Sequence, residues 1–186
     1  MKIYCLSHSQ IPSRYANAVH AMQMCQAFAK KGHDVILFAK TGELPAENDF
    51  GYYAVEECFK IVKIPFHPKK WISKIGYVVQ AIRMSQRLGT PDLFHVLHIY
   101  MLPFVKPFRK PVVFEAHAFP GNPVERWILG AFLKRNPSAY LVTNSSSLKD
   151  ALIKLFPFLK PDDILAAPNG GIASVSYTHL DAADEE

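Results

Sequence analysis

Short apolar runs alternate with longer amphipathic segments along most of the chain. Apolar or alternating character in the short runs predicts strands, and apolar positions that recur every three to four residues in the longer segments predict helices. The predicted strands span residues 2–7, 34–39, 59–65, 93–99, 111–117, 139–144 and 164–167. The predicted helices span residues 15–31, 71–88, 124–134 and 147–155, and residues 40–58 are expected to form a loop.

The alternation of strand and helix predicts an α/β fold. The segment DVILFA, residues 34–39, is apolar almost throughout, which is typical of a strand buried on both faces. Lys30 and Lys31 precede Gly32 at the expected end of the first helix, as basic residues and glycine commonly do. We therefore expect a Rossmann-like, doubly wound parallel sheet with helices on both faces.

The chain of 186 residues is long enough for one domain with a substantial core, and we assign this domain to residues 1–173. The remaining residues, 174–186, read SVSYTHLDAADEE and have no apolar periodicity. Their composition shifts abruptly to acidic. We interpret them as a non-native or disordered tail and leave them out of the fold.

The stretch PVVFEAHAFPGNP, residues 111–123, places charged and titratable side chains at the end of an apolar strand. In open parallel sheets, ligands bind beyond the carboxyl ends of the strands. Glu115 and His117 are two residues apart and therefore face the same side of a strand. His117 can exchange protons near neutral pH, and Glu115 can orient its ring or pair with a cation. The alternative is a purely structural histidine at a strand end.

The loop at residues 8–17 has no glycine, so the dinucleotide-binding fingerprint is absent. It does open a helix, whose N-terminus suits an anion, and Ser13, Arg14 and Asn17 add donors for a phosphate. The alternative reading is that Ser13 only caps the helix.

Other polar residues receive structural interpretations. His95 and His98 are three apart on a strand, so they face opposite sides and are expected to pack. We expect no metal site, because no third ligand sits at a recognisable spacing from Glu115 and His117. Ser147 and Asp150 fit a capping box at the start of a helix.

The charge of the chain indicates which kinds of partner it could bind. The net charge is +5, and without residues 176–186 the remaining 21 basic and 12 acidic residues give +9. A basic body suits anionic partners, or is simply a solvated surface. Residues 66–88 combine apolar and basic positions and either pack on the sheet or lie on an anionic membrane.

The three cysteines are expected to be buried and reduced, and the absence of a signal-like start favours a cytoplasmic protein.

Four segments together resemble the N-terminal domain of family 4-like glycosyltransferases, which have the GT-B fold. The segments are residues 12–36 with the strand entry Gly-His-x-Val, residues 91–95 (PDLFH), residues 112–117 (VVFEAH), and residues 143–149 with 168–170 (PNG). The resemblance covers nearly all of residues 1–173. It implies the N-terminal half of a two-domain enzyme with its active site in the cleft between two Rossmann-like domains.

The resemblance also implies a function. Such an enzyme transfers a sugar from a nucleotide-sugar donor to the hydroxyl of a glycan, lipid-linked or small-molecule acceptor, generally with retention and without a metal or other cofactor. The N-terminal domain mostly holds the acceptor, and the second domain holds the donor through a Glu-x7-Glu element. His117 matches a family histidine near the donor sugar, with Glu115 beside it. Asn169 and Gly170 match the interdomain entry.

The chain departs from the family pattern in two places. Its first loop lacks the glycine pair that is common where Ser13, Arg14 and Asn17 would approach the donor phosphate. The sequence also stops at the interdomain entry, so this chain alone is expected to be inactive. We expect no nucleic-acid partner, and a cytoplasmic protein with an optional peripheral contact at the inner face of the membrane.

Two alternatives stay open. One is a fragment of a nucleotide-sugar epimerase with the same GT-B architecture. The other is a non-catalytic α/β module that binds a phosphorylated ligand.

Overall fold

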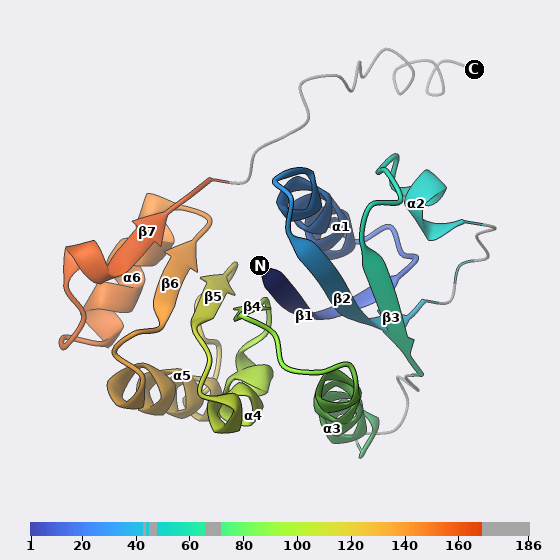
Figure 1. The fold of residues 1–186 in the computed structure, drawn as a ribbon. Coiled ribbons are helices and arrows are strands. Elements are labelled where there is room, and N and C mark those ends of the chain that lie inside the picture. The colour runs from blue at the N-terminus through green and yellow to red at the C-terminus, as the bar shows by residue number, and fades with distance from the viewer. Residues whose placement is uncertain (43, 45–47, 66–71, 169–186) are drawn as a thin grey trace, which may run out of the picture.

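Seven parallel strands form one sheet in the computed structural model, which describes residues 1–42, 44, 48–65 and 72–168 (Figure 1). The strand order is β3-β2-β1-β4-β5-β6-β7. The strands are β1 (Lys2–Ile11), β2 (Asp34–Thr41), β3 (Lys60–Ile64), β4 (Leu93–Val96), β5 (Val112–Ala116), β6 (Tyr140–Thr143) and β7 (Ile164–Ala166). The expected α/β sheet is therefore confirmed. Asn169, Gly170 and the acidic tail lie outside the described residues.

The chain winds in two directions from β1. It first adds β2 and β3 on one side, then returns to β4 on the other side and continues outward to β7. In register, Ile3 of β1 pairs with Val35 of β2 and with Leu93 of β4. The strand order reverses between β1 and β4, and such a switch point is where open α/β sheets bind ligands.

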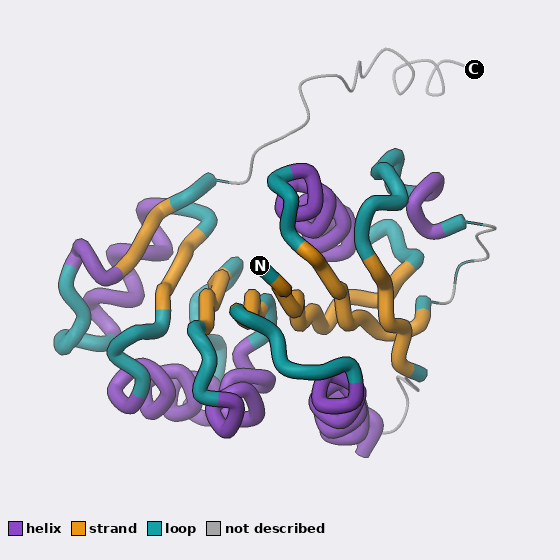
Figure 2. Tube along the Cα trace, in the orientation of Figure 1, coloured by secondary structure: helices purple, strands orange, loops and turns teal. Residues whose placement is uncertain are grey.

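Helices cover the two faces of the sheet unequally (Figures 1 and 2). The α-helices are α1 (Ala16–Lys30), α2 (Asp49–Tyr52), α3 (Ile72–Arg87), α4 (Leu102–Val105), α5 (Pro123–Arg135) and α6 (Ser146–Leu155). Side chains of α1 and of the α2 region pack with one face, in a cluster that includes Ile3, Cys5 and Leu37. Side chains of α3 to α6 pack with the opposite face, around Tyr4 and Phe94.

Helix α1 begins and ends as its sequence predicts. Met22 and Cys25 of its apolar face are buried against the sheet. Gly32 follows the helix with a φ of +82°, a left-handed conformation that glycine adopts without steric cost. The turn lets the chain enter β2, whose six central residues are buried.

Several boundaries differ from the sequence predictions. β1 continues through the expected loop to Ile11 and is followed by a cis peptide bond before Pro12. The short helices α2 and α4 were not predicted, because four-residue helices carry too few positions to show a period. Helix α6 is capped by Ser145, whose hydroxyl accepts a hydrogen bond from the Leu148 N–H, so the prediction of Ser147 as the cap was wrong.

Helix α3 packs on the sheet in the part whose side chains are described. Tyr77, Val78 and Ala81 are buried, and the Tyr77 hydroxyl donates to the carbonyl of Ser7. The structural interpretation of this amphipathic segment is thus supported, while residues 66–71 lie outside the description. Among the described helices, none has the length and apolar character needed to cross a bilayer.

Candidate functional site

A buried carboxylate, Glu115, lies at the carboxyl end of β5 and contacts three histidines. Its side chain is only 5% exposed. Oε1 lies 2.9 Å from Nε2 of His20 and 3.3 Å from Nε2 of His117, and Oε2 lies 3.0 Å from Nε2 of His95. We refer to these four residues as the Glu115 cluster.

Three different elements bring the histidines to Glu115. His20 comes from the second turn of α1, His95 from β4, and His117 from the residue after the end of β5. His95 lies beside Val113 in the register of β4 and β5, so it shares a sheet face with Glu115. Burial increases from His117, whose side chain is 31% exposed, to His95 at 4%. The cluster therefore opens to the outside at His117.

The end of β6 holds the backbone of His117 in place. The Asn144 side-chain amide donates to the carbonyl of His117 at 3.3 Å, and the Asn144 N–H donates to the carbonyl of Ala116 at 3.4 Å. Sequence analysis did not assign this positioning role to Asn144, because it depends on β5 and β6 being neighbours.

The cluster keeps Glu115 ionised. Burial alone would raise the pKa of its carboxyl group, but the contacts with His117, His20 and His95 outweigh burial and hold that pKa well below its usual range. The pKa of His95 responds in the opposite sense. Burial would lower it, but the Cys5 thiol and the Glu115 carboxylate raise it. Among the described residues, the groups that contact this ionised carboxylate are thus imidazoles.

The sequence interpretation of this region is partly confirmed. Glu115 and His117 meet, as their spacing predicts. The prediction that His95 and His98 lie on one strand was wrong, because β4 ends at Val96 and His98 lies beyond it. His95 contacts Glu115 and is not simply packing. His20 was missed because its approach to β5 depends on how α1 crosses the sheet. Cys5 and Cys25 are buried and free, whereas Cys58 is exposed, so the expectation of burial was wrong for Cys58.

A hollow of about 850 Å³ lies on the α1 side of the sheet and reaches the Glu115 cluster. Its wall includes His20, His95 and Glu115 at one end, and Val113 and Tyr140 along the strands. Tyr140 and Leu165 expose 67% and 64% of their surface on this stretch. The hollow thus follows the sheet face from Glu115 toward the amino ends of β5 and β6, and His117 is not part of its wall.

A second polar group lies at the switch point between β1 and β4. The rings of His8 and His98 stack with their centroids 4.1 Å apart. The ammonium of Lys40, a residue only 3% exposed, lies 2.9 Å from Nδ1 of His8. His8 also meets the ring of Tyr77 edge-on. Sequence analysis did not find this group, because it placed His8 in a loop, whereas His8 lies in β1.

The three residues predicted to bind phosphate lie just before and within the first turn of α1. Tyr15 is the N-cap residue and makes no side-chain capping bond, so Ser13 does not cap the helix. Ser13 is buried instead, and its N–H donates to the hydroxyl of Tyr53 at 2.6 Å. Arg14 and Asn17 are exposed. None of these three residues lines the hollow beside the Glu115 cluster.

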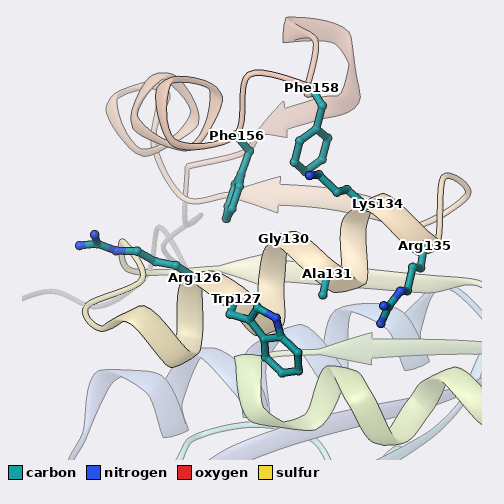
Figure 3. Close-up of a pocket in the computed structure, with 8 residues that line it drawn as sticks. All are labelled: Arg126, Trp127, Gly130, Ala131, Lys134, Arg135, Phe156 and Phe158. Atoms are coloured by element: carbon teal, nitrogen blue, oxygen red, sulfur yellow. The ribbon is translucent and has the colours of Figure 1, made fainter.

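A smaller hollow of about 320 Å³ lies between α5 and the segment that follows α6 (Figure 3). Figure 3 shows Phe156 and Phe158 facing α5, which contributes Trp127 and Lys134. Trp127 is 69% exposed, and the Lys134 ammonium lies 5.1 Å from the ring centre of Phe158. This basic and aromatic surface is separate from the Glu115 cluster.

Comparison with protein families identifies the domain. The model of Glycosyltransferase Family 4 matches residues 18–170, which include the whole Glu115 cluster. The chain belongs to glycosyltransferase family 4. No curated protein sequence matches the chain significantly.

Solved structures place this family 4 domain among GT-B proteins. HepE from Anabaena, solved with UDP and glucose, has a TM-score of 0.61 at 13% identity, covering 92% of this chain and 45% of HepE. The lipopolysaccharide outer core galactosyltransferase WaaB has a TM-score of 0.60 at 11% identity, covering 92% and 46%. A UDP-GlcNAc 2-epimerase from Methanocaldococcus jannaschii has a TM-score of 0.64 at 13% identity, covering 91% and 46%.

These similarities show the fold, and each of them covers only part of the other protein. The chain spans less than half the length of each of these three proteins.

Proposed function

We propose that this chain is the acceptor-side domain of a glycosyltransferase that moves a sugar from a nucleotide-sugar donor to an acceptor hydroxyl. The observation that carries the proposal is the Glu115 cluster. It lies at the carboxyl edge of a family 4 domain, borders a hollow, and exposes His117. The donor would be held mainly by a second domain, so the chain alone would be inactive.

His117 is the residue we assign to the reacting groups. Its Nε2 faces the carboxylate of Glu115 at 3.3 Å, which leaves Nδ1 as the ring nitrogen for a ligand. When the neutral ring of His117 donates its Nε2–H to the Glu115 carboxylate, Nδ1 is left as an acceptor. A hydroxyl of the sugar or of the acceptor can donate a hydrogen bond to it. General acid–base help of this kind contributes roughly 10²–10⁴-fold to rate. Glu115 and Asn144 act as positioning residues.

The start of α1 is our proposed contact for the donor phosphate. The helix has no side-chain cap, so N–H groups of its first turn are available to an anion. Arg14 and Asn17 are exposed there, and Ser13 fixes the loop through Tyr53. In the complete enzyme, Arg14→Ala would raise KM for the donor with a smaller change in kcat. An unchanged KM would remove the phosphate assignment.

An epimerase remains the second candidate, because a UDP-GlcNAc 2-epimerase is among the structural neighbours. The test uses a protein that contains this domain together with the proposed second domain, here called the parent. The parent is incubated with UDP-glucose and with UDP-GlcNAc, and the products are followed by NMR.

The product separates the candidates. Release of UDP with transfer or hydrolysis of the sugar supports the transferase. Appearance of a donor epimer replaces it with the epimerase. Binding of either nucleotide sugar without turnover favours the non-catalytic binding module.

We further propose that the basic, aromatic surface of α5 contacts anionic lipid, which would place the enzyme at the inner face of the membrane. Arg126, Lys134 and Arg135 supply the charge around exposed Trp127, a combination suited to a membrane interface. Binding to phosphatidylserine vesicles should fall in Trp127→Ala and at high salt, while Leu165→Ala on the other face binds as the parent does. Equal binding of the two variants would refute this surface.

A further inference from the structure

We propose that His20 is a positioning residue that keeps the ring of His117 in its working orientation. What His117 then does rests on the proposed function, but its orientation can be measured without any activity. His20 lies in the second turn of α1, between the buried residues Ala18 and Met22, so its backbone belongs to a rigid element. Its side chain is 15% exposed and contacts both Glu115 and His117.

The first contact joins two rings. The rings of His20 and His117 meet edge-on, with centroids 4.6 Å apart and an angle of 75° between their planes. The side chain of His117 is 31% exposed, so solvent on its open side leaves the ring room to turn. The last torsion angle of a histidine is broad and roughly two-fold, which makes such turning easy. A turning His117 ring would meet the ring of His20, which therefore restricts the motion.

A half-turn of the His117 ring would remove both of the contacts assigned to it. The ring now directs Nε2 to Oε1 of Glu115 at 3.3 Å. A half-turn about the last torsion angle exchanges Nε2 with Cε1 and Nδ1 with Cδ2. A carbon atom would then face the carboxylate, and another carbon would stand where Nδ1 meets the ligand. Hydrogen bonding at both places depends on the nitrogens, so the ring works in only one of its two orientations.

The second contact is a shared carboxylate oxygen. Oε1 of Glu115 lies 2.9 Å from Nε2 of His20, and Oε2 lies 3.0 Å from Nε2 of His95. Nε2 of His20 is buried and not aligned for a hydrogen bond, so its contact with Oε1 is electrostatic. Because imidazoles lie against both oxygens, the carboxylate cannot rotate without moving away from one of them. Oε1 therefore stays directed to His117.

The experiment observes the ring of His117 in the isolated chain by NMR. The ¹⁵N-labelled chain is kept at about pH 8, where an ordinary histidine is neutral, and spectra that correlate ring nitrogens with carbon-bound ring protons are recorded. These spectra distinguish a ring protonated on Nε2 from one protonated on Nδ1. The His117 signals are assigned by their absence from His117→Gln. We expect the Nε2–H form in the unmodified chain and a mixture of both forms in His20→Ala.

Further variants separate the ring contact from a general disturbance. His33→Ala, just beyond the end of α1, is the matched histidine control and should leave the His117 signals unchanged. His20→Phe keeps a ring beside His117 and should retain more of the Nε2–H form than His20→Ala. If His20→Ala does not fold, His20→Gln takes its place, because it also lacks the ring. Equal proportions of the two forms with and without the His20 ring would overturn the inference, as would an Nδ1–H form in the unmodified chain.

Turnover by the parent gives a second, independent readout. A misplaced reacting group costs up to about 100-fold in rate, so His20→Ala should lower kcat by roughly 10–100-fold and leave KM for the nucleotide sugar unchanged. His20→Phe should recover part of the loss. If the parent consumed no nucleotide sugar, the proposed function would fail, while the NMR result would still decide the role of His20. If His117→Ala lost turnover but His20→Ala matched the parent, only the role of His20 would be refuted.

Discussion

The hydroxyl of Tyr53 ties the loop before α1 to the segment after α2, and its removal should measurably destabilise the protein. It accepts a hydrogen bond from the Ser13 N–H at 2.6 Å and donates one to the Ser13 carbonyl at 2.9 Å. Tyr53 is 7% exposed and Ser13 is equally buried. Tyr53→Phe keeps the ring and deletes only the hydroxyl, so two backbone groups of Ser13 lose a partner in a buried place.

The expected cost follows from these two bonds. An intramolecular hydrogen bond contributes about 0.5–1.5 kcal/mol net, and a buried group left without its partner costs about 1–3 kcal/mol. Because the loop can relax toward water, we expect Tyr53→Phe to lower the free energy of unfolding by about 2–3 kcal/mol. With a urea m-value of about 2 kcal/mol/M, the unfolding midpoint would fall by roughly 1–1.5 M.

The assay is urea unfolding followed by far-UV circular dichroism. The matched control is Tyr52→Phe, one residue away, at a residue that is 40% exposed. This control should unfold within about 0.5 kcal/mol of the parent, as exposed substitutions generally do. If the two variants unfolded at the same urea concentration, the buried bridge between Ser13 and Tyr53 would not stabilise the loop, and our account of how the loop is held would be wrong.

Three other predictions test the packing, the cap and the charge of the cluster. Leu152→Ala removes a fully buried core side chain and should lower the free energy of unfolding in urea by about 2–5 kcal/mol. Leu165 is 64% exposed, so Leu165→Ala should stay close to the parent, and similar losses in the two variants would contradict the assigned burial. Ser145→Ala should cost about 0.5–2 kcal/mol and Ser147→Ala much less, and the reverse order would restore Ser147 as the cap. The lowered pKa of Glu115 adds stability that is complete above its ordinary value of 4.5 and is lost as pH falls below it, so the free energy of unfolding of Glu115→Gln should decline less between pH 5 and 3 than that of the parent; parallel declines would contradict the assignment.

Local patterns in the sequence predicted the strands and the longer helices, because each depends on residues close together in the chain. Gly32 and the apolar face of α1 are examples. The pairing of Glu115 with His117 also followed from a spacing of two residues. The contacts of Glu115 with His20 and His95 were not predicted, because they require knowledge of neighbouring elements. One local prediction also failed, since Ser145 and not Ser147 caps α6.

The Glu115 cluster shows the physical reason. His20 and His95 reach Glu115 only because α1 crosses the sheet near β5, and because β4 and β5 are adjacent. Neither arrangement can be inferred from the spacing of apolar residues within one segment of the sequence.

The central claim is that the Glu115 cluster forms part of the catalytic site of a glycosyltransferase, and turnover by His117→Ala tests it most directly. The variant is made in a parent that includes the proposed second domain, and it is assayed with the nucleotide sugar that this parent consumes fastest. Arg87→Ala, on the last turn of α3 across the sheet, is the control for handling and folding. Our account predicts a fall of roughly 10²–10⁴-fold for His117→Ala and no change for the control. Equal turnover by the parent and both variants would contradict it.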